Sequence, residues 1–209
     1  LGISLKKIGA SSPKAKFAEF NSPKLQSKRE KYFYNGFTYG KTGDFFSSQD
    51  IYLHTSVGDV QFRTFGGETS WQGEIKGGAA AGGKIGGGNV SFYCKQVMGK
   101  GIYGNYNDEK SLLAWAKGAQ DGAYQKRLYE LYKKYNSKSK TSKKLIDEVD
   151  FYAELAGKDF KFKNSKLICM EFLDVILGGS KAKQDEFTTK MFRYAQSDVD
   201  QSSYFVKLY

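Results

Sequence analysis

Residues 50–65 read DIYLHTSVGDVQFRTF, two β-favouring runs separated by a turn. The runs cover 50–55 and 60–65, and Val57-Gly58-Asp59 supplies the turn between them. An earlier aromatic stretch, 32–39, is interrupted by Asn35-Gly36, which is a strong hairpin signal. Further strands are predicted at Trp71–Lys76 and Asn89–Val97. The first hundred residues are therefore predicted to form mostly sheet.

Apolar residues recur at helical spacing after Asn107. Helices are predicted at 107–119, 123–135, 142–153, 164–177 and 185–195. Asn107 or Asp108 is the predicted N-terminal cap of the first, Ser142 of the third and Asn164 of the fourth. Gly178-Gly179 is the predicted C-terminal signal of the fourth. A last strand is predicted at Tyr204–Leu208. The sequence thus predicts an α+β fold with a mostly antiparallel N-terminal sheet (1–105), a C-terminal helical layer (106–209) and a final strand that returns to the sheet, all in one cooperative domain.

The positive charge of the chain is clustered. Its 209 residues carry a net charge of +11, with eight Lys or Arg against two acids in 1–34 and eight against one in 126–144. Clustered positive charge attracts polyphosphate backbones, which predicts a DNA or RNA partner. A flexible solvated linker at 136–144 is the alternative interpretation. The candidate nucleic-acid contacts are Arg63, Trp71, Lys84, Lys133, Lys134, Lys138, Lys140, Lys143 and Lys144.

Aromatic residues lie among lysines and Arg63 in the sheet half of the chain. Their rings can stack nucleobases while cations follow the phosphates. Alternation along strands sends about half of them into the core instead. The tyrosines of 124–135 are interpreted as a packed helix face.

Glycine fills half of the sixteen positions from Gly73 to Gly88. Glycine permits close backbone approach and loses the most conformational entropy on ordering. Residues 77–88 are therefore predicted to form an exposed loop that meets an anionic ligand or a protein partner.

Asp59, Glu74 and Lys76 are the candidate catalytic residues. Glu74 and Lys76 share one strand face, and Asp59 begins the preceding strand. Asp59 and Glu74 are the oxygen ligands that Mg²⁺ would need, and Lys76 can offset phosphate charge. This arrangement resembles the PD-(D/E)xK nuclease superfamily over about eighteen residues, although the proline before the Asp is missing. The resemblance implies a Mg²⁺-dependent phosphodiesterase. The alternative is a cross-strand ion pair on an exposed strand.

The opening residues, Gly2-Ile3-Ser4-Leu5-Lys6, resemble the last core strand of the same superfamily. The resemblance implies that Lys6 is the retained lysine and Ser4 stands at the degenerate acid position. The metal-binding Asp would then precede Leu1, which would explain why the chain opens in mid-strand. An apolar strand followed by a basic loop explains the same residues.

Several other chemistries find no support in the sequence. The glycine run contains no nucleotide-binding P-loop, and one histidine with two separated cysteines makes no zinc motif. Cys94 and Cys169 are predicted to be buried and reduced, and His54 to be a strand-face residue. No apolar run is long enough to predict a membrane span. The chain is predicted to be an intracellular or virion nucleic-acid-binding protein, of the kind bacteriophages encode, as a nuclease or a nuclease-derived scaffold. The alternatives are a structural protein of a virion or other assembly, and a non-catalytic single-strand-binding protein.

Overall fold

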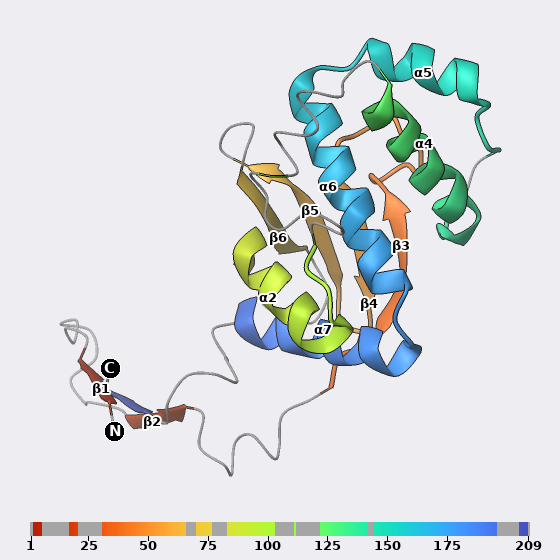
Figure 1. Cartoon of the computed structure of the whole chain (residues 1–209). Helices are drawn as coiled ribbons and strands as arrows, with labels where there is room; N and C mark the ends of the chain where they lie inside the picture. The colour runs from red at the N-terminus through yellow and green to blue at the C-terminus, as the bar shows by residue number, and fades with distance from the viewer. Residues whose placement is uncertain are drawn as a thin grey trace.

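A computed structural model gives the fold of the chain (Figure 1). It describes residues 2–5, 17–20, 31–65, 70–76, 83–102, 111, 122–141, 144–195 and 205–208. The fold is α+β, as the sequence predicts.

The main sheet has five strands in the order β3-β4-β5-β6-β7, and every neighbouring pair is antiparallel. The strands are β3 (Tyr34–Tyr39), β4 (Ile51–Thr55), β5 (Asp59–Phe65), β6 (Ser70–Lys76) and β7 (Lys84–Gly86). The β4–β5 hairpin confirms the prediction for 50–65, and its turn closes through the Thr55 amide, which donates to the Gly58 carbonyl at 3.1 Å. The sheet therefore follows chain order from one edge to the other.

The hairpin predicted at Asn35-Gly36 is wrong. Both flanks of this dipeptide lie in the single strand β3 and pair with β4, and the register shifts between Tyr34 and Gly36. Gly36 has φ of +117°, which a side-chain-bearing residue rarely adopts. The Asn-Gly signal therefore marks a β-bulge, because the bulge needs the same backbone freedom as a tight turn.

The helices cover one face of the main sheet, and α6 crosses it (Figure 1). They are α2 (Gly87–Met98), α4 (Ala123–Tyr135), α5 (Glu148–Ala156), α6 (Phe160–Leu177) and α7 (Lys181–Ala195), with a 3₁₀ turn, η1 (Asn136–Lys138), after α4. Helix α4 matches its prediction, and α6 ends at Gly178 as expected. Most of the helix predicted at 107–119 lies outside the described residues; within it only Ser111 is described, as helical.

Three helix starts differ from the prediction. Helix α5 begins after Asp147, whose carboxylate accepts the Asp150 amide at 3.0 Å, and α6 begins after Asp159, whose carboxylate accepts the Phe162 amide at 2.7 Å. Asn164 is buried inside α6, and α7 begins at Lys181. Aspartate caps as well as serine or asparagine, so several cap residues near each start make the boundary ambiguous.

The predicted strand at 89–97 is a helix. Val90, Tyr93, Cys94 and Val97 are buried along one face of α2, whereas Phe92 on the other face is 44% exposed. This i, i+3, i+4, i+7 spacing is helical, but the short apolar run imitates a strand. The glycine run is likewise not one loop, because β7 and the start of α2 occupy 84–88.

Two glycines of the run, Gly73 and Gly83, allow close packing. A Cβ on Gly73 would lie 2.6 Å from the Phe62 ring, and one on Gly83 would lie 2.3 Å from the Ala195 carbonyl oxygen. Residues 77–82 of the predicted loop lie outside the described residues.

One hydrophobic core joins the two halves of the chain. The Phe62 ring stacks on Trp71 with centroids 5.0 Å apart and lies 4.7 Å from Phe172 of α6. Cys94 and Cys169 are buried and free, as predicted. The tyrosines of α4 (Tyr124, Tyr129, Tyr132 and Tyr135) are also buried, which confirms that they are a packed face.

A second sheet contains β1 (Gly2–Leu5), β2 (Phe17–Phe20) and β8 (Phe205–Leu208). Strand β8 lies between the other two, parallel to β1 and antiparallel to β2. The final strand thus returns to N-terminal strands, as predicted, but these belong to the small sheet and not to the five-stranded one.

Candidate functional site

The candidate catalytic residues share the sheet face that points away from the helices. Asp59 is paired with Lys76 across β5 and β6, and Gln61 with Glu74. Asp59 and Glu74 are therefore diagonal neighbours on one face, because residues two apart on a strand point the same way.

Each carboxylate on this face has a protein partner. The Asp59 carboxylate lies 2.8 Å from His54 Nδ1, and His54 Nε2 lies 3.1 Å from the Thr38 hydroxyl. Glu74 lies 3.0 Å from Lys76 Nζ and 3.9 Å from Arg63 Nη2. The hydrogen bond from Lys76 lowers the pKa of Glu74. The Arg63–Glu74 contact is a cross-strand ion pair of the kind that the sequence left as an alternative, whereas Glu74 and Lys76 pair within β6. Within the described ranges no three His, Cys, Asp or Glu side chains gather as a metal site.

The same face is hollowed by a recess of about 510 Å³, which we call the sheet recess. Its charged lining residues are Lys41, Asp50, Arg63 and Lys76, and hydroxyl groups of Ser47, Ser48 and Tyr52 complete much of its wall. Two of these cations, Arg63 and Lys76, are sequence candidates that the structure brings together.

Trp71 cannot stack a nucleobase as predicted. It is 3% exposed, and its indole N–H donates to Cys169 Sγ at 3.4 Å inside the core. Strand alternation places Trp71 on the helix-facing side of β6, whereas Gln72 points outward. Phe37, Tyr39 and Phe62 are buried in the same way.

The remaining candidate lysines are spread over two regions. Lys84 lies opposite Glu74 in β7, whereas the Lys140 amide donates to the Phe37 carbonyl at 2.9 Å beside the edge of β3. Lys144 is exposed. Lys6 and Lys143 lie outside the described residues, as do the other lysines and arginines of the N-terminal basic block except Lys31.

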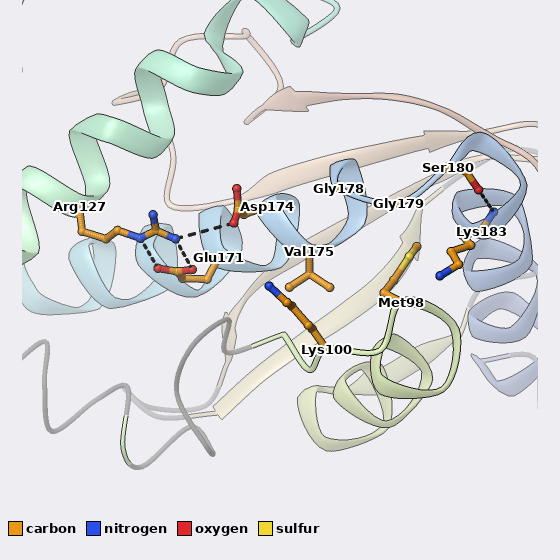
Figure 2. Close-up of a pocket in the computed structure, with 10 residues that line it drawn as sticks. All are labelled: Met98, Lys100, Arg127, Glu171, Asp174, Val175, Gly178, Gly179, Ser180 and Lys183. Atoms are coloured by element: carbon orange, nitrogen blue, oxygen red, sulfur yellow. Dashed lines mark hydrogen bonds and ion pairs between the residues drawn. The ribbon is translucent and has the colours of Figure 1, made fainter.

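A second recess, of about 360 Å³, lies among the helices, and we call it the helix recess (Figure 2). Lys100 reaches it from the segment after α2, Lys183 from the first turn of α7, and Arg127 from α4. Glu171 and Asp174 of α6 form its acidic wall. Figure 2 shows Val175 and Met98 between the two lysine side chains.

Helix α4 supplies the cations that match these two acids. Glu171 is 1% exposed and accepts two hydrogen bonds from Arg127, at 2.7 Å from Nε and 2.8 Å from Nη2. Asp174 accepts from Lys134 at 2.7 Å and from the Tyr135 hydroxyl at 2.5 Å. Burial raises the pKa of Asp174, but these hydrogen bonds outweigh it and leave the pKa below its usual value. Both carboxylates are therefore compensated without Lys100 or Lys183.

Lysines of the predicted central basic block lie along α4 and η1, and Lys134 pairs with Asp174 of this recess. The ammonium groups of Lys134 and Lys138 lie 5.1 Å and 5.3 Å from the centre of the Tyr135 ring, and that of Lys133 lies 5.6 Å from Tyr129. Cation–π contact holds such side chains near the surface without neutralising them. Residues 126–138 of the block are thus helical. Of the segment 136–144, for which a linker is the alternative, 136–138 form η1, and 142–143 lie outside the described residues.

Sequence reasoning missed Lys100 and Lys183 because both lie outside the two basic blocks. A signal for both exists: Lys100 lies between Gly99 and Gly101, and Lys183 follows Gly178-Gly179-Ser180. Glycines that end helices bring the next side chains close to neighbouring elements. Gly99 has φ of +80° and ends α2 in this way.

No protein-family model matches the chain, and neither a curated protein nor a solved structure matches it. In the described part of the chain, no helix has the length and apolar character needed to cross a membrane.

Proposed function

We propose that the protein binds nucleic acid through a basic surface made of the helix recess and the exposed lysines of α4 and η1. The observation that carries this proposal is the meeting of Lys100 and Lys183 at one recess. These lysines are far apart in sequence and belong to different elements. Among the described residues neither lysine forms an ion pair with an acid, and Glu171 and Asp174 pair with Arg127 and Lys134 instead.

Electrostatics gives this surface its affinity for phosphates. Uncompensated lysines in a concave site attract a polyanion more strongly than the same lysines on a flat surface, because the low-dielectric walls focus the field. The amino groups of Lys133 in α4 and Lys138 in η1 extend the positive surface. A phosphate backbone that follows the helix would release counterions at each contact.

The buried aromatics indicate how binding occurs. Trp71, Phe37 and Phe62 are inside the core, so these rings of the five-stranded sheet cannot stack on bases. The structure therefore favours contact with the phosphate backbone over a single-strand-binding mode that depends on stacked bases.

The test is fluorescence anisotropy with a labelled oligonucleotide at several salt concentrations. Each lost phosphate contact reduces the slope of log K against log salt by about 0.7–0.9. Replacing both Lys100 and Lys183 with glutamine should therefore reduce the slope by about 1.4–1.8.

A matched double variant, Lys158→Gln with Lys161→Gln, removes the same charge near the start of α6, outside both basic blocks. Lys161 lies thirteen residues before Asp174 in α6, which is about 20 Å along the helix axis. Equal slopes for the two double variants would refute the proposed location. Wild-type affinity that is unaffected by salt would refute the proposed function.

A further inference from the structure

The sheet recess contains a buried carboxylate oxygen without a hydrogen-bond partner. Asp50 is 7% exposed; its Oδ2 accepts from Gln61 Nε2, whereas its Oδ1 is buried and has no partner among the described residues. A buried acceptor left unsatisfied costs about 1–3 kcal/mol. The arrangement therefore favours a hydrogen-bond donor that comes from outside the fold.

The fold holds Asp50 firmly in this position. Its amide donates to the Ser48 hydroxyl at 3.1 Å, and its carbonyl accepts from the Gly40 amide at 3.0 Å and from Lys166 Nζ at 3.2 Å. Lys166 is fully buried in α6, on the opposite side of the sheet. Since its backbone and one carboxylate oxygen are fixed, Asp50 cannot turn away to find another partner.

The opposite requirement, for an acceptor, is present in the same recess. Arg63 Nε is buried without a hydrogen-bond partner in the described part of the chain, and Arg63 Nη2 lies a long 3.9 Å from Glu74. Lys41 and Lys76 add two more cations to the lining. Glu74 alone is shared between Arg63 and Lys76, so the cations of the recess outnumber the acids.

From this pairing we infer that the sheet recess binds a phosphorylated sugar. The phosphate group would lie against Arg63, Lys41 and Lys76, and a sugar hydroxyl would donate to Asp50 Oδ1. The hydroxyl-rich wall suits a polyol, and a volume of about 510 Å³ is large enough for one sugar phosphate. A free sugar phosphate and the 5′-terminal nucleotide of a strand share this chemistry. The inference does not depend on the proposed nucleic-acid surface, which lies on other elements.

Isothermal titration calorimetry on the full chain tests the inference with three probes: ribose 5-phosphate, ribose and inorganic phosphate. We expect saturable binding of ribose 5-phosphate that is stronger than binding of either component alone. Arg63→Gln should weaken it by about tenfold or more, because a charge-assisted contact is lost. Asp50→Asn should weaken ribose 5-phosphate but leave inorganic phosphate within about twofold.

Lys84→Gln is the matched control, because Lys84 is on the same sheet but outside the recess. It should leave the affinity within about twofold. If Asp50→Asn fails to fold, the wild-type preference for ribose 5-phosphate over inorganic phosphate tests the Asp50 contact, and Lys41→Gln, at an exposed lining residue, tests the phosphate contact. Lys41→Gln should weaken ribose 5-phosphate by several-fold.

Competition with oligonucleotides identifies the source of the ligand. Displacement of ribose 5-phosphate by a 5′-phosphorylated strand, but not by the same strand with a 5′-hydroxyl, assigns the recess to strand ends. No displacement by either strand assigns it to free sugar phosphates. Three results would overturn the inference: no saturable binding of ribose 5-phosphate up to about 10 mM, equal affinity for inorganic phosphate, or an unchanged affinity in Arg63→Gln.

Discussion

Replacing Arg127 with methionine should destabilise the protein strongly, because it leaves Glu171 as a buried charge without a partner. The Glu171 side chain is 1% exposed and receives two short hydrogen bonds from the guanidinium. Removing one member of a buried pair costs about 3–5 kcal/mol. The Arg127 side chain is 31% exposed, so water can reach part of the site and the lower end, about 3 kcal/mol, applies.

For a chain of this size, about 3 kcal/mol corresponds to a fall in melting temperature of about 6–12 °C. Thermal unfolding followed by circular dichroism measures this change, and urea unfolding gives the free energy. The double variant Arg127→Met with Glu171→Met should recover most of the loss, since neither charge then remains buried. Lys126→Met, on an exposed neighbouring position of α4, should change stability by less than about 0.5 kcal/mol. A melting temperature of Arg127→Met equal to that of Lys126→Met would refute the charge balance assigned to the helix recess.

Three further variants test other parts of the structure. Gly83→Ala should lose about 2 kcal/mol or more in urea unfolding, because Gly83 has φ of +152° and its Cβ would meet the Ala195 carbonyl. Lys166→Met should be more stable than the wild type at neutral pH, by up to about 3 kcal/mol, because burial lowers the pKa of Lys166 to about 8 in the folded protein. Between about pH 8 and 10 the unfolded wild-type chain binds more protons than the folded one, so the stability of the wild type rises with pH. The stability difference between Lys166→Met and the wild type should therefore shrink through that window. Glu74→Gln should change the free energy of unfolding by less than about 1 kcal/mol, because the ion pair of Glu74 with Lys76 is partly exposed. A loss of Mg²⁺-dependent strand cleavage in the same variant would support the nuclease hypothesis.

The sequence predicts the fold class because the apolar pattern of strands and the apolar pattern of helices occupy different parts of the chain. The hairpin at 50–65 and the helix at 123–135 both have clear apolar patterns, and both are present in the structure. The segment 89–97 was predicted incorrectly because Val90, Tyr93 and Val97 form a short apolar run that suits either element. Tertiary packing against the rest of the core decides such cases.

The candidate sites were predicted less completely, for a physical reason. Arg63, Glu74 and Lys76 come together because neighbouring strands bring them to one face, and strand alternation is readable from sequence. The meeting of Lys100 with Lys183 depends on how α2 and α7 pack, and no local pattern encodes that contact. Trp71 illustrates the converse error, since composition alone cannot say which face of a strand is buried.

Lysine labelling with and without a bound oligonucleotide tests the central claim most directly. Acetylation of exposed amino groups, followed by mass spectrometry, reports the accessibility of each lysine separately. The proposed surface predicts that the oligonucleotide protects Lys100 and Lys183 at low salt and that protection disappears at high salt, whereas Lys161 reacts equally in both states. Equal reactivity of Lys100 and Lys183 with and without bound oligonucleotide would contradict the claim that nucleic acid binds at the helix recess.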